Sequence, residues 1–307
     1  MAIKKTPSPE KPKSLYTNPW IDYINPDLKE VDMLVEKYRF HPLDRDSIIE
    51  ENQYARIDSY DDYVFMVLHF PKYDERSERY ISNEFNIFIA PDYLMTFRYF
   101  QTSTVKKLQE KYEAWPVDTP YPNSGLFLYE LIENLLEHVM RMLEKFHKDL
   151  KVIEKSLFTA SGPELIREIM TKKRNIITLK HMISPQISVM KLMRMRMANM
   201  FGEEVATYFE NLEDRLDKIY SETLIIQENI DSMEDTLKSI FELKTNSTIK
   251  YLTIFSAFML PLTFVTSFFG MNTEAWHFDD TYIIASIIIL TLIMIILTYI
   301  SLSKNKI

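Results

Sequence analysis

Two long runs of uncharged residues, 251–273 and 281–303, lie near the end of the chain. At about 1.5 Å of rise per residue, a helix over either run is long enough to cross a hydrocarbon core of about 30 Å. The pattern therefore predicts two transmembrane helices, joined by a short acidic loop. Gly270, one of four glycines in the chain, falls where the first run ends. A glycine there lets the chain leave a helix at low steric cost.

Basic residues flank the two runs on one side only. Lys244 and Lys250 precede the first run, and Lys304 and Lys306 follow the second, whereas the loop between them has no Lys or Arg. Positively charged flanks stay on the cytoplasmic side. Both termini are therefore predicted in the cytoplasm, below a cell (inner) membrane, or in the matrix if the membrane belongs to an organelle.

The N-terminal part mixes two periodicities. Proline and lysine dominate residues 1–19, which predicts a disordered tail. Helical patterns follow at 31–38 and 44–52, the second with Asp44 as N-cap. Strand patterns cover 60–70, 84–89 and 93–99, bounded by Pro71 and Pro91.

From residue 126 onward the pattern is helical. An amphipathic helix is predicted over 126–158, and a returning helix over 163–200 is expected to bend at Pro185. No glycine or proline lies between Gly202 and Pro261, so one long helix is predicted there. The fold class is therefore an α+β domain followed by a long-helix stalk and two C-terminal membrane helices. The predicted divisions are a tail (1–19), an α/β domain (20–124), a helical hairpin (125–202), a stalk helix entering the first span (203–269), an outer loop (270–280), a second span (281–303) and a basic tail (304–307).

Composition excludes several classes of function. The chain has no cysteine, so thiolate metal sites and cysteine nucleophiles are excluded, and no catalytic motif or phosphate-binding glycine loop predicts an enzyme. A net charge of −8 disfavours nucleic acid as a partner. Residues 203–242 hold twelve acids and three bases. Such a stem would attract cations, although a solvated helix face explains the same charge run.

A stripe of small and hydroxylated residues follows the first span. Steps of three and four residues connect Asn246, Ile249, Thr253, Ser256, Leu260, Thr263, Ser267 and Gly270, and continue back to Asp235 and Glu242. One span cannot enclose a pore, so a pore lined by this stripe requires a symmetric ring of copies. Amide and hydroxyl oxygens suit a hydrated hard cation, and apolar rings at Ile249 and Leu260 could gate by dewetting. Close packing between membrane helices is the alternative, since small residues favour that too.

The chain resembles the CorA family of divalent-cation transporters. The resemblance rests on Gly270-Met271-Asn272 after the first span, on the preceding segment 259–264, and on 63–68 in the N-terminal domain. It implies a funnel-shaped homopentamer in a lipid membrane that takes up Mg²⁺, with Co²⁺ or Ni²⁺ as further substrates. Driven by the membrane potential, such a channel needs no ATP.

The resemblance also implies site residues. Asn272 would form the outer selectivity ring, with Gly270, Met271 and Glu274 shaping the exit, while Leu252 would join the pore-lining set. Asp235 would stand near the cytoplasmic mouth. Asp74 would meet a stalk position at Asn211, flanked by Glu210 and Asp214, as a regulatory Mg²⁺ site between subunits.

Some residues depart from the family pattern. Asn211 is neutral where the family has an acid, which would weaken the regulatory site. The loop after Asn272 lacks the proline-containing acidic signature of magnesium members and carries His277, and the basic tail is sparse. Zinc transporters share the Gly-x-Asn core, so Zn²⁺ stays an alternative substrate. A membrane-anchored scaffold that does not conduct is the rival function.

Overall fold

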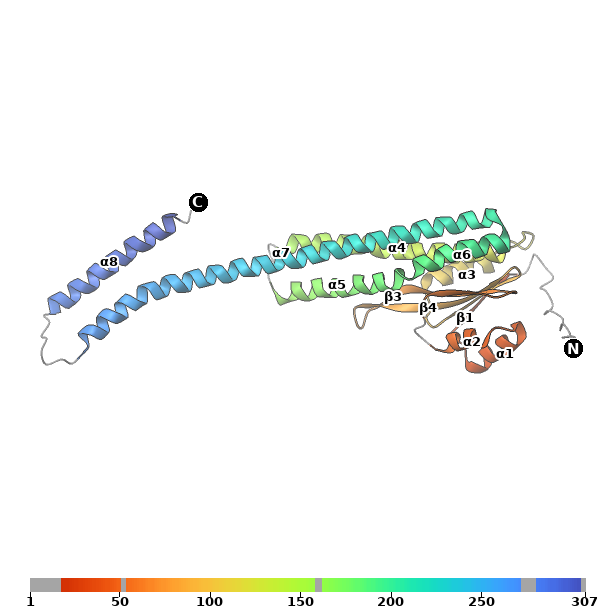
Figure 1. The fold of residues 1–307 in the computed structure, drawn as a ribbon, viewed down its shortest axis with the longest axis horizontal. Coiled ribbons are helices and arrows are strands. Elements are labelled where there is room, and N and C mark those ends of the chain that lie inside the picture. Colours follow the sequence, from red (N-terminus) through yellow and green to blue (C-terminus); the bar gives the residue numbers. More distant parts are fainter. Residues whose placement is uncertain (1–17, 51–53, 158–161, 272–279, 305–307) are drawn as a thin grey trace. The chain divides into compact units, whose positions relative to one another are not determined.

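The protein is described from a computed structural model, in which residues 18–50, 54–157, 162–271 and 280–304 are placed (Figure 1). The chain divides into two compact units, Met1–Glu234 and Asp235–Ile307. The predicted tail at 1–19 lies almost wholly outside the described residues.

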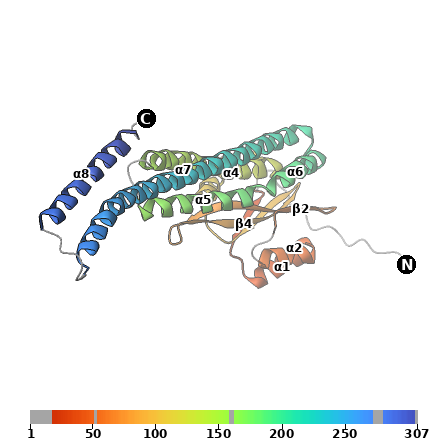
Figure 2. The same cartoon turned by 60° about the vertical axis from the view of Figure 1, so that its left-hand side comes forward.

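A five-stranded sheet forms the centre of the first unit (Figure 2). Its strand order is β1-β5-β4-β3-β2, with β1 parallel to β5 and the other neighbours antiparallel. The strands are β1 (Trp20–Ile24), β2 (Arg56–Ser59), β3 (Val64–Asp74), β4 (Arg79–Ala90) and β5 (Tyr93–Arg98). The predicted strands correspond to β3, β4 and β5, whereas the sequence pattern predicted neither β1 nor β2.

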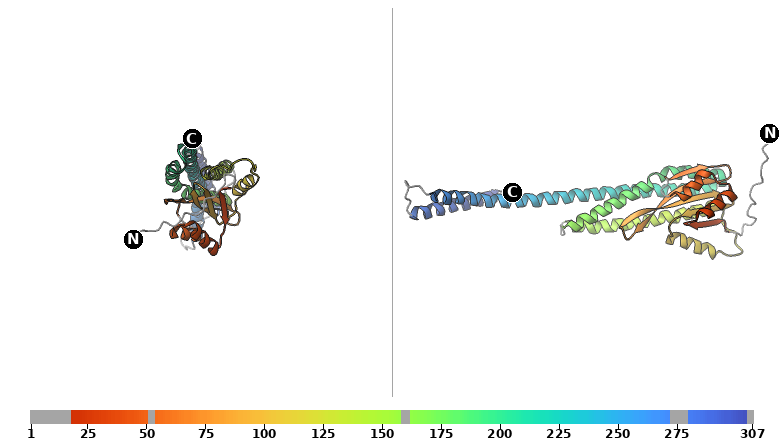
Figure 3. Two further views of the ribbon diagram at one scale, coloured as in Figure 1. Left: turned by 90° about the vertical axis from the view of Figure 1, so that its right-hand side faces the viewer. Right: turned by 90° about the horizontal axis from the view of Figure 1, so that it is seen from below.

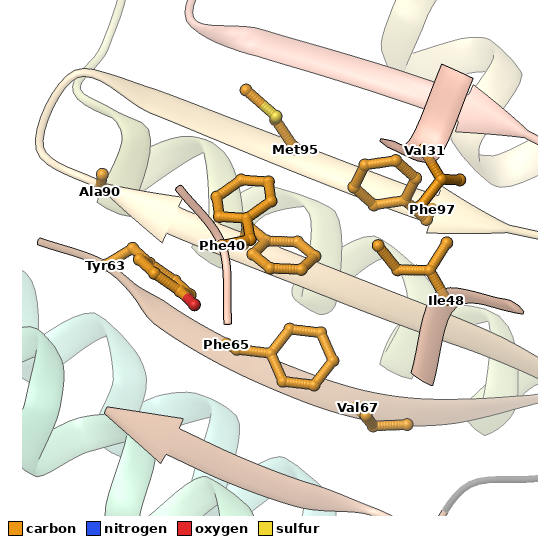
Figure 4. Close-up of a cluster of buried hydrophobic side chains, with 10 residues drawn as sticks. Val31, Phe40, Ile48, Tyr63, Phe65, Val67, Ala90, Met95 and Phe97 are labelled. Carbon is orange, nitrogen blue, oxygen red and sulfur yellow. The ribbon is translucent and has the colours of Figure 1, made fainter. Parts of the chain in front are cut away.

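Helices cover both faces of this sheet (Figure 3). On one face, α1 (Leu28–Tyr38) and α2 (Pro42–Ile49) enclose an aromatic cluster (Figure 4). Phe40 stacks on Phe88 with ring centroids 4.0 Å apart, and Phe65 and Phe97 complete the cluster from the sheet. The opposite face packs on α4 (Ser124–Ser156), α5 (Pro163–Ile183) and α6 (Gln186–Phe201), and α3 (Ser103–Glu113) packs on α4. This unit is thus a three-layer structure with the sheet in the middle.

The strand β3 runs through Pro71, which the sequence pattern had placed as its end. Beyond Val67, β3 pairs with β4 on one side only, because the pairing with β2 ends there. Proline is tolerated at such an edge, where its missing N–H costs no ladder hydrogen bond. The buried Gln186 of α6 occupies the same edge: its Oε1 accepts from the His69 N–H at 3.1 Å, and its Nε2 donates to the His69 carbonyl at 2.8 Å. A side chain therefore replaces a neighbouring strand and fixes α6 to the sheet.

Asp44 does not cap α2, contrary to the sequence prediction. The N-cap is His41, whose Nδ1 accepts from the Leu43 N–H at 3.2 Å. Asp44 is fully buried, and it accepts hydrogen bonds from the hydroxyls of Tyr60 at 3.0 Å and Tyr63 at 2.8 Å. Burial raises the pKa of the Asp44 carboxyl above 3.8, although the two hydroxyls oppose that shift.

The buried carboxyl predicts a specific pH dependence of stability. Because the native pKa is raised, Asp44 contributes most stability below the unfolded value of 3.8 and loses it as pH rises through the native pKa. Asp44→Asn does not titrate at this site, so the wild type should lose stability relative to Asp44→Asn as pH rises through that window. Urea unfolding over a pH series measures the difference. Asp46→Asn, at an exposed neighbouring position, is the control; parallel profiles for Asp44→Asn and the wild type would contradict the prediction.

The long helix α7 (Glu203–Phe269) spans 67 residues and continues through Pro261, over the range 203–269 that the sequence pattern predicts as a stalk helix entering the first span. Gly202 joins it to α6 with φ +91°, a backbone conformation that favours glycine. In the first unit its buried side chains recur every three or four residues. They are Val205, Phe209, Leu212, Leu216, Ile219, Thr223, Ile226, Ile230 and Met233. The returning helix predicted with a bend at Pro185 is instead two helices, α5 and α6, that meet there.

In the second unit, the remainder of α7 and α8 (Asp280–Lys304) are the helices. Among the described residues, one helix, Glu203–Phe268, contains a segment long and apolar enough to cross a membrane, and a shorter apolar helix covers Ile284–Met294. None of the apolar segment is buried. The first predicted span therefore coincides with a helix whose apolar side chains require lipid or other chains around them.

Candidate transport site

The predicted pore stripe lies on the part of α7 that belongs to the second unit. Every stripe side chain from Asn246 to Ser267 is exposed. The apolar members are open to an unusual degree, with Ile249 at 55% exposure, Leu252 at 63% and Leu260 at 69%. Large apolar side chains this exposed on a helix long and apolar enough to cross a membrane need contacts outside the chain.

The stripe hydroxyls leave their oxygens available as acceptors. Thr253 donates its hydroxyl hydrogen to the Ile249 carbonyl at 2.8 Å, and Thr263 donates to the Met259 carbonyl at 2.8 Å. A hydroxyl used in this way keeps its lone pairs for another partner. An exposed threonine on this face can therefore accept a hydrogen bond from the water shell of a cation.

Pro261 lies inside the span. It has no N–H, so the carbonyl four residues earlier, at Ala257, loses its usual helical donor. Such a position is a common origin of helix bends. Along the chain, Pro261 stands between two members of the stripe, the apolar Leu260 and the hydroxylated Thr263.

Gly270 directly follows the last residue of α7. Its φ is not in the left-handed region, and its N–H donates to the Thr266 carbonyl at 3.0 Å. An ideal Cβ on Gly270 would lie 3.0 Å from that same oxygen, so any side chain requires the helix end to shift. Met271 follows at 63% exposure. Asn272, Glu274 and His277, the other predicted exit residues, lie outside the described residues.

The acidic end of the stripe is exposed. Asp235 accepts a hydrogen bond from the ammonium of Lys238, 3.3 Å away, and its side chain is 78% exposed. Glu242 and Asn246 are also exposed. Their exposure and charge fit a solvated entrance for cations, and equally fit an ordinary solvent-facing helix surface.

Asp74 stands at the end of β3, at the start of the turn into β4. Its Oδ2 accepts from the Ser77 hydroxyl at 2.6 Å, and its Oδ1 accepts from the Arg76 N–H at 3.3 Å. The hydrogen bond from Ser77 is the main cause that lowers the pKa of Asp74. The carboxylate is therefore ionised at neutral pH, as a ligand for a divalent cation must be.

The side-chain oxygen of Asn211 is engaged by an arginine of its own helix. Arg215 Nε donates to the Asn211 side-chain oxygen at 3.0 Å, and Arg215 Nη2 lies 3.1 Å from Glu133. Arg194 approaches Glu210 at 3.7 Å. Among the described residues, no hydrogen bond or ion pair joins Asp74 to Asn211 within one chain, and no group of three or more acids and histidines is placed to hold a metal ion.

The acids of the α7 stem are partly neutralised within the chain. Lys173 of α5 contacts both Asp231 at 2.8 Å and Glu234 at 2.6 Å, and the two acids raise the pKa of Lys173. His147 of α4 lies 3.0 Å from Glu222. The attraction for cations expected from the twelve acids is therefore smaller than a count of charges suggests. The sequence pattern did not indicate these partners, because they come from helices far away along the chain.

A family model described as "CorA-like Mg2+ transporter protein" matches residues 17–304. The chain belongs to this CorA family. The match covers both units, so it includes the α/β domain, the long helix and the segment of the predicted exit.

Individual relatives agree with the family assignment. The CorA chain is 23% identical over 266 residues to the cobalt/magnesium transport protein CorA of Thermotoga maritima, an alignment that covers 85% of this chain and 76% of the relative. It is also 21% identical to the zinc transport protein ZntB of Yersinia enterocolitica, over 61% of this chain and 60% of that protein. Relatives named for different ions thus match the same sequence.

A solved structure confirms the fold. The CorA magnesium transporter from Methanocaldococcus jannaschii matches with a TM-score of 0.77 at 18% identity, covering 91% of this chain and 89% of that one. The predicted α+β domain with a long helix is therefore confirmed for this CorA chain.

Proposed function

We propose that this protein transports a divalent metal cation across a cell membrane through a pore built by several copies of the chain, with Mg²⁺ as the foremost substrate. The family match over residues 17–304 is the observation that carries the proposal. The exposed hydroxylated stripe supports it, because one such helix cannot enclose a pore, whereas a ring of copies can. Five copies, as the family resemblance implies, would make a homopentamer in the lipid bilayer.

The transport is passive in this proposal. A potential of 100 mV acting on a divalent ion supplies about 4.6 kcal/mol, at about 2.3 kcal/mol per charge. Thr253, Ser256, Thr263 and Ser267 would line the pore with oxygens, while Ile249, Leu252 and Leu260 would narrow it. Asn272 would form the selective exit together with Gly270, Met271 and Glu274.

Metal uptake by proteoliposomes tests this function. The purified protein should admit Mg²⁺ when the vesicle interior is negative, and uptake should fall when the potential is removed. Intact protein that admits no divalent ion would favour the non-conducting scaffold. Competition among Mg²⁺, Co²⁺, Ni²⁺ and Zn²⁺ identifies the ion. Zn²⁺ is the second candidate, because a relative named as a zinc transporter aligns with this chain.

We further propose that internal Mg²⁺ closes the pore by linking Asp74 to the region of Asn211, Glu210 and Asp214 on a neighbouring copy. The ionised Asp74 supplies a ligand, whereas the neutral Asn211, whose side-chain oxygen accepts from Arg215, makes the opposite side of the site a weak one. Closure should therefore need more Mg²⁺ than a site with two acids would need.

Asp74→Ala should keep the channel conducting at an internal Mg²⁺ concentration that silences the wild type. Asn211→Asp should shift closure to lower Mg²⁺, and more so when Arg215→Gln removes the competing guanidinium. Inhibition curves from proteoliposomes loaded with graded Mg²⁺ measure both shifts. Glu75→Ala, which removes the adjacent carboxylate, is the control and should leave the curve in place. If Asp74→Ala and Asn211→Asp leave it in place as well, closure arises elsewhere, with Asp235 the next candidate.

A further inference from the structure

Two adjoining hollows open at the start of α3 in the first unit. The larger, of about 330 Å³, lies between α3 and α4, and the smaller, of about 180 Å³, reaches toward β3 and β4. Ser103, Thr104 and His138 line both hollows. The beginning of α3 is therefore a wall shared by two adjoining hollows, and the transport proposal uses neither of them.

The start of α3 offers hydrogen-bond donors. Its N-cap, Thr102, accepts from the Val105 N–H at 3.3 Å. The N–H groups of Ser103 and Thr104 belong to the first turn and have no partner within the helix. Together with the two side-chain hydroxyls and the positive end of the helix dipole, they favour an anion.

Positive charge gathers around the larger hollow. Lys107, Lys111 and Arg141 line it, against one acid, Glu130. That acid is already engaged, because Lys111 and the Tyr112 hydroxyl both contact its carboxylate. Arg141 in turn contacts Glu137, its neighbour on α4. Of the three cations in this wall, Lys107 remains. Among the described residues, no acid forms an ion pair with it.

Asn83 gives the smaller hollow a second, independent feature. This side chain on β4 lines the hollow and is 1% exposed. Its Nδ2 reaches the Phe100 carbonyl at 3.5 Å, and its Oδ1 has no hydrogen-bond partner among the described residues. Buried amide oxygens are nearly always satisfied, so an unsatisfied one in the wall of a hollow points to a bound donor.

We propose that the two hollows bind a small soluble phosphomonoester that also carries a hydroxyl or amino group. The phosphate occupies the larger hollow, against the start of α3 and Lys107. The hydroxyl or amino group reaches the smaller hollow and donates to Asn83. The shared wall at Ser103 and Thr104 places the two subsites next to each other, which a compact ligand can span.

Calorimetry on the full-length protein in detergent tests this proposal, with sn-glycerol 3-phosphate and inorganic phosphate as the probes. The first probe should bind about tenfold more tightly, because only it presents a separate hydroxyl to Asn83. Lys107→Ala should weaken binding of both probes by about tenfold, since a hydrogen bond to a charged group is lost. Lys106→Ala is the matched control, because Lys106 is exposed, lines neither hollow and faces Glu110 at 3.8 Å.

Asn83→Leu separates binding from folding. A leucine of similar size removes an unsatisfied polar group, so the ligand-free variant should be at least as stable as the wild type. Asn83→Leu should bind sn-glycerol 3-phosphate no more tightly than inorganic phosphate, because the hydroxyl of the first probe has lost its acceptor. A third arm uses micelles containing phosphatidic acid, which carries the same phosphate group on a lipid. The proposal is overturned if neither soluble probe binds, if Lys106→Ala weakens binding as much as Lys107→Ala, or if only the lipid binds.

Discussion

Asn272→Ala is expected to abolish divalent-metal uptake while the oligomer still assembles. In the proposed ring, each copy contributes one amide oxygen that accepts from the water shell of the ion, and alanine has no acceptor. A loss of about 1 kcal/mol in each copy of a ring lowers ion binding by at least about a hundredfold. Initial uptake rates in proteoliposomes measure the effect, and size-exclusion chromatography verifies the assembly.

Asn272→Gln is the matched control for this ring. It keeps the amide and lengthens the side chain by one methylene, so it should retain part of the uptake and change the order of preference among Mg²⁺, Co²⁺ and Zn²⁺. Uptake at the wild-type rate by a correctly assembled Asn272→Ala protein would show that the ring is not the filter. In that event, the hydroxyl positions at Thr263 and Ser267 are the next to test.

Arg98→Met is expected to destabilise the first unit by about 3–5 kcal/mol. Arg98 and Asp22 form a buried ion pair with 2.7 Å between Nη2 and Oδ2, and their side chains are 0% and 2% exposed. Asp22 also accepts from Thr96 at 2.7 Å and from Gln109 at 2.9 Å. Removing the guanidinium leaves a buried carboxylate without its counter-charge, and the contacts that hold β1 to β5 and α3 are weakened together.

The matched control is Arg45→Met, the same substitution in an exposed pair. Arg45 lies 2.6 Å from Asp32, with the two side chains 32% and 49% exposed, and its loss should cost less than about 1 kcal/mol. Urea unfolding of the full-length protein, followed by tryptophan fluorescence, compares the variants. Equal costs for Arg98→Met and Arg45→Met would contradict the argument from burial. Asp22→Leu combined with Arg98→Met should recover much of the lost stability, since no charge is then left buried.

Local patterns in the sequence were enough to predict several elements. The helix α4 and the course of α7 up to Pro261 follow from amphipathic spacing and from the absence of glycine and proline. The family was also recognisable, because Gly270-Met271-Asn272 stands at the end of the first uncharged run. These features depend on residues that are close together in the chain, so the local sequence is enough to predict them.

Other features depend on residues far apart in sequence. Pro71 remains inside β3 because β2 stops pairing with that strand at Val67, and Asp44 is buried where Tyr60 and Tyr63 reach it from the connection between β2 and β3. A proline or an aspartate at these positions indicates a strand end or a helix cap when only its neighbours are considered.

The same reason applies to the candidate sites. The stripe on α7 was visible from helical spacing alone, whereas the ion pairs of Lys173 and the hollows around Asn83 and Lys107 bring together elements that are distant along the chain. Hydrophobic period and chain-breaking residues determine where helices and strands form. Which polar groups become buried, and which partners satisfy them, is decided only when the sheet and helices pack, because desolvation and hydrogen bonding depend on the completed surroundings.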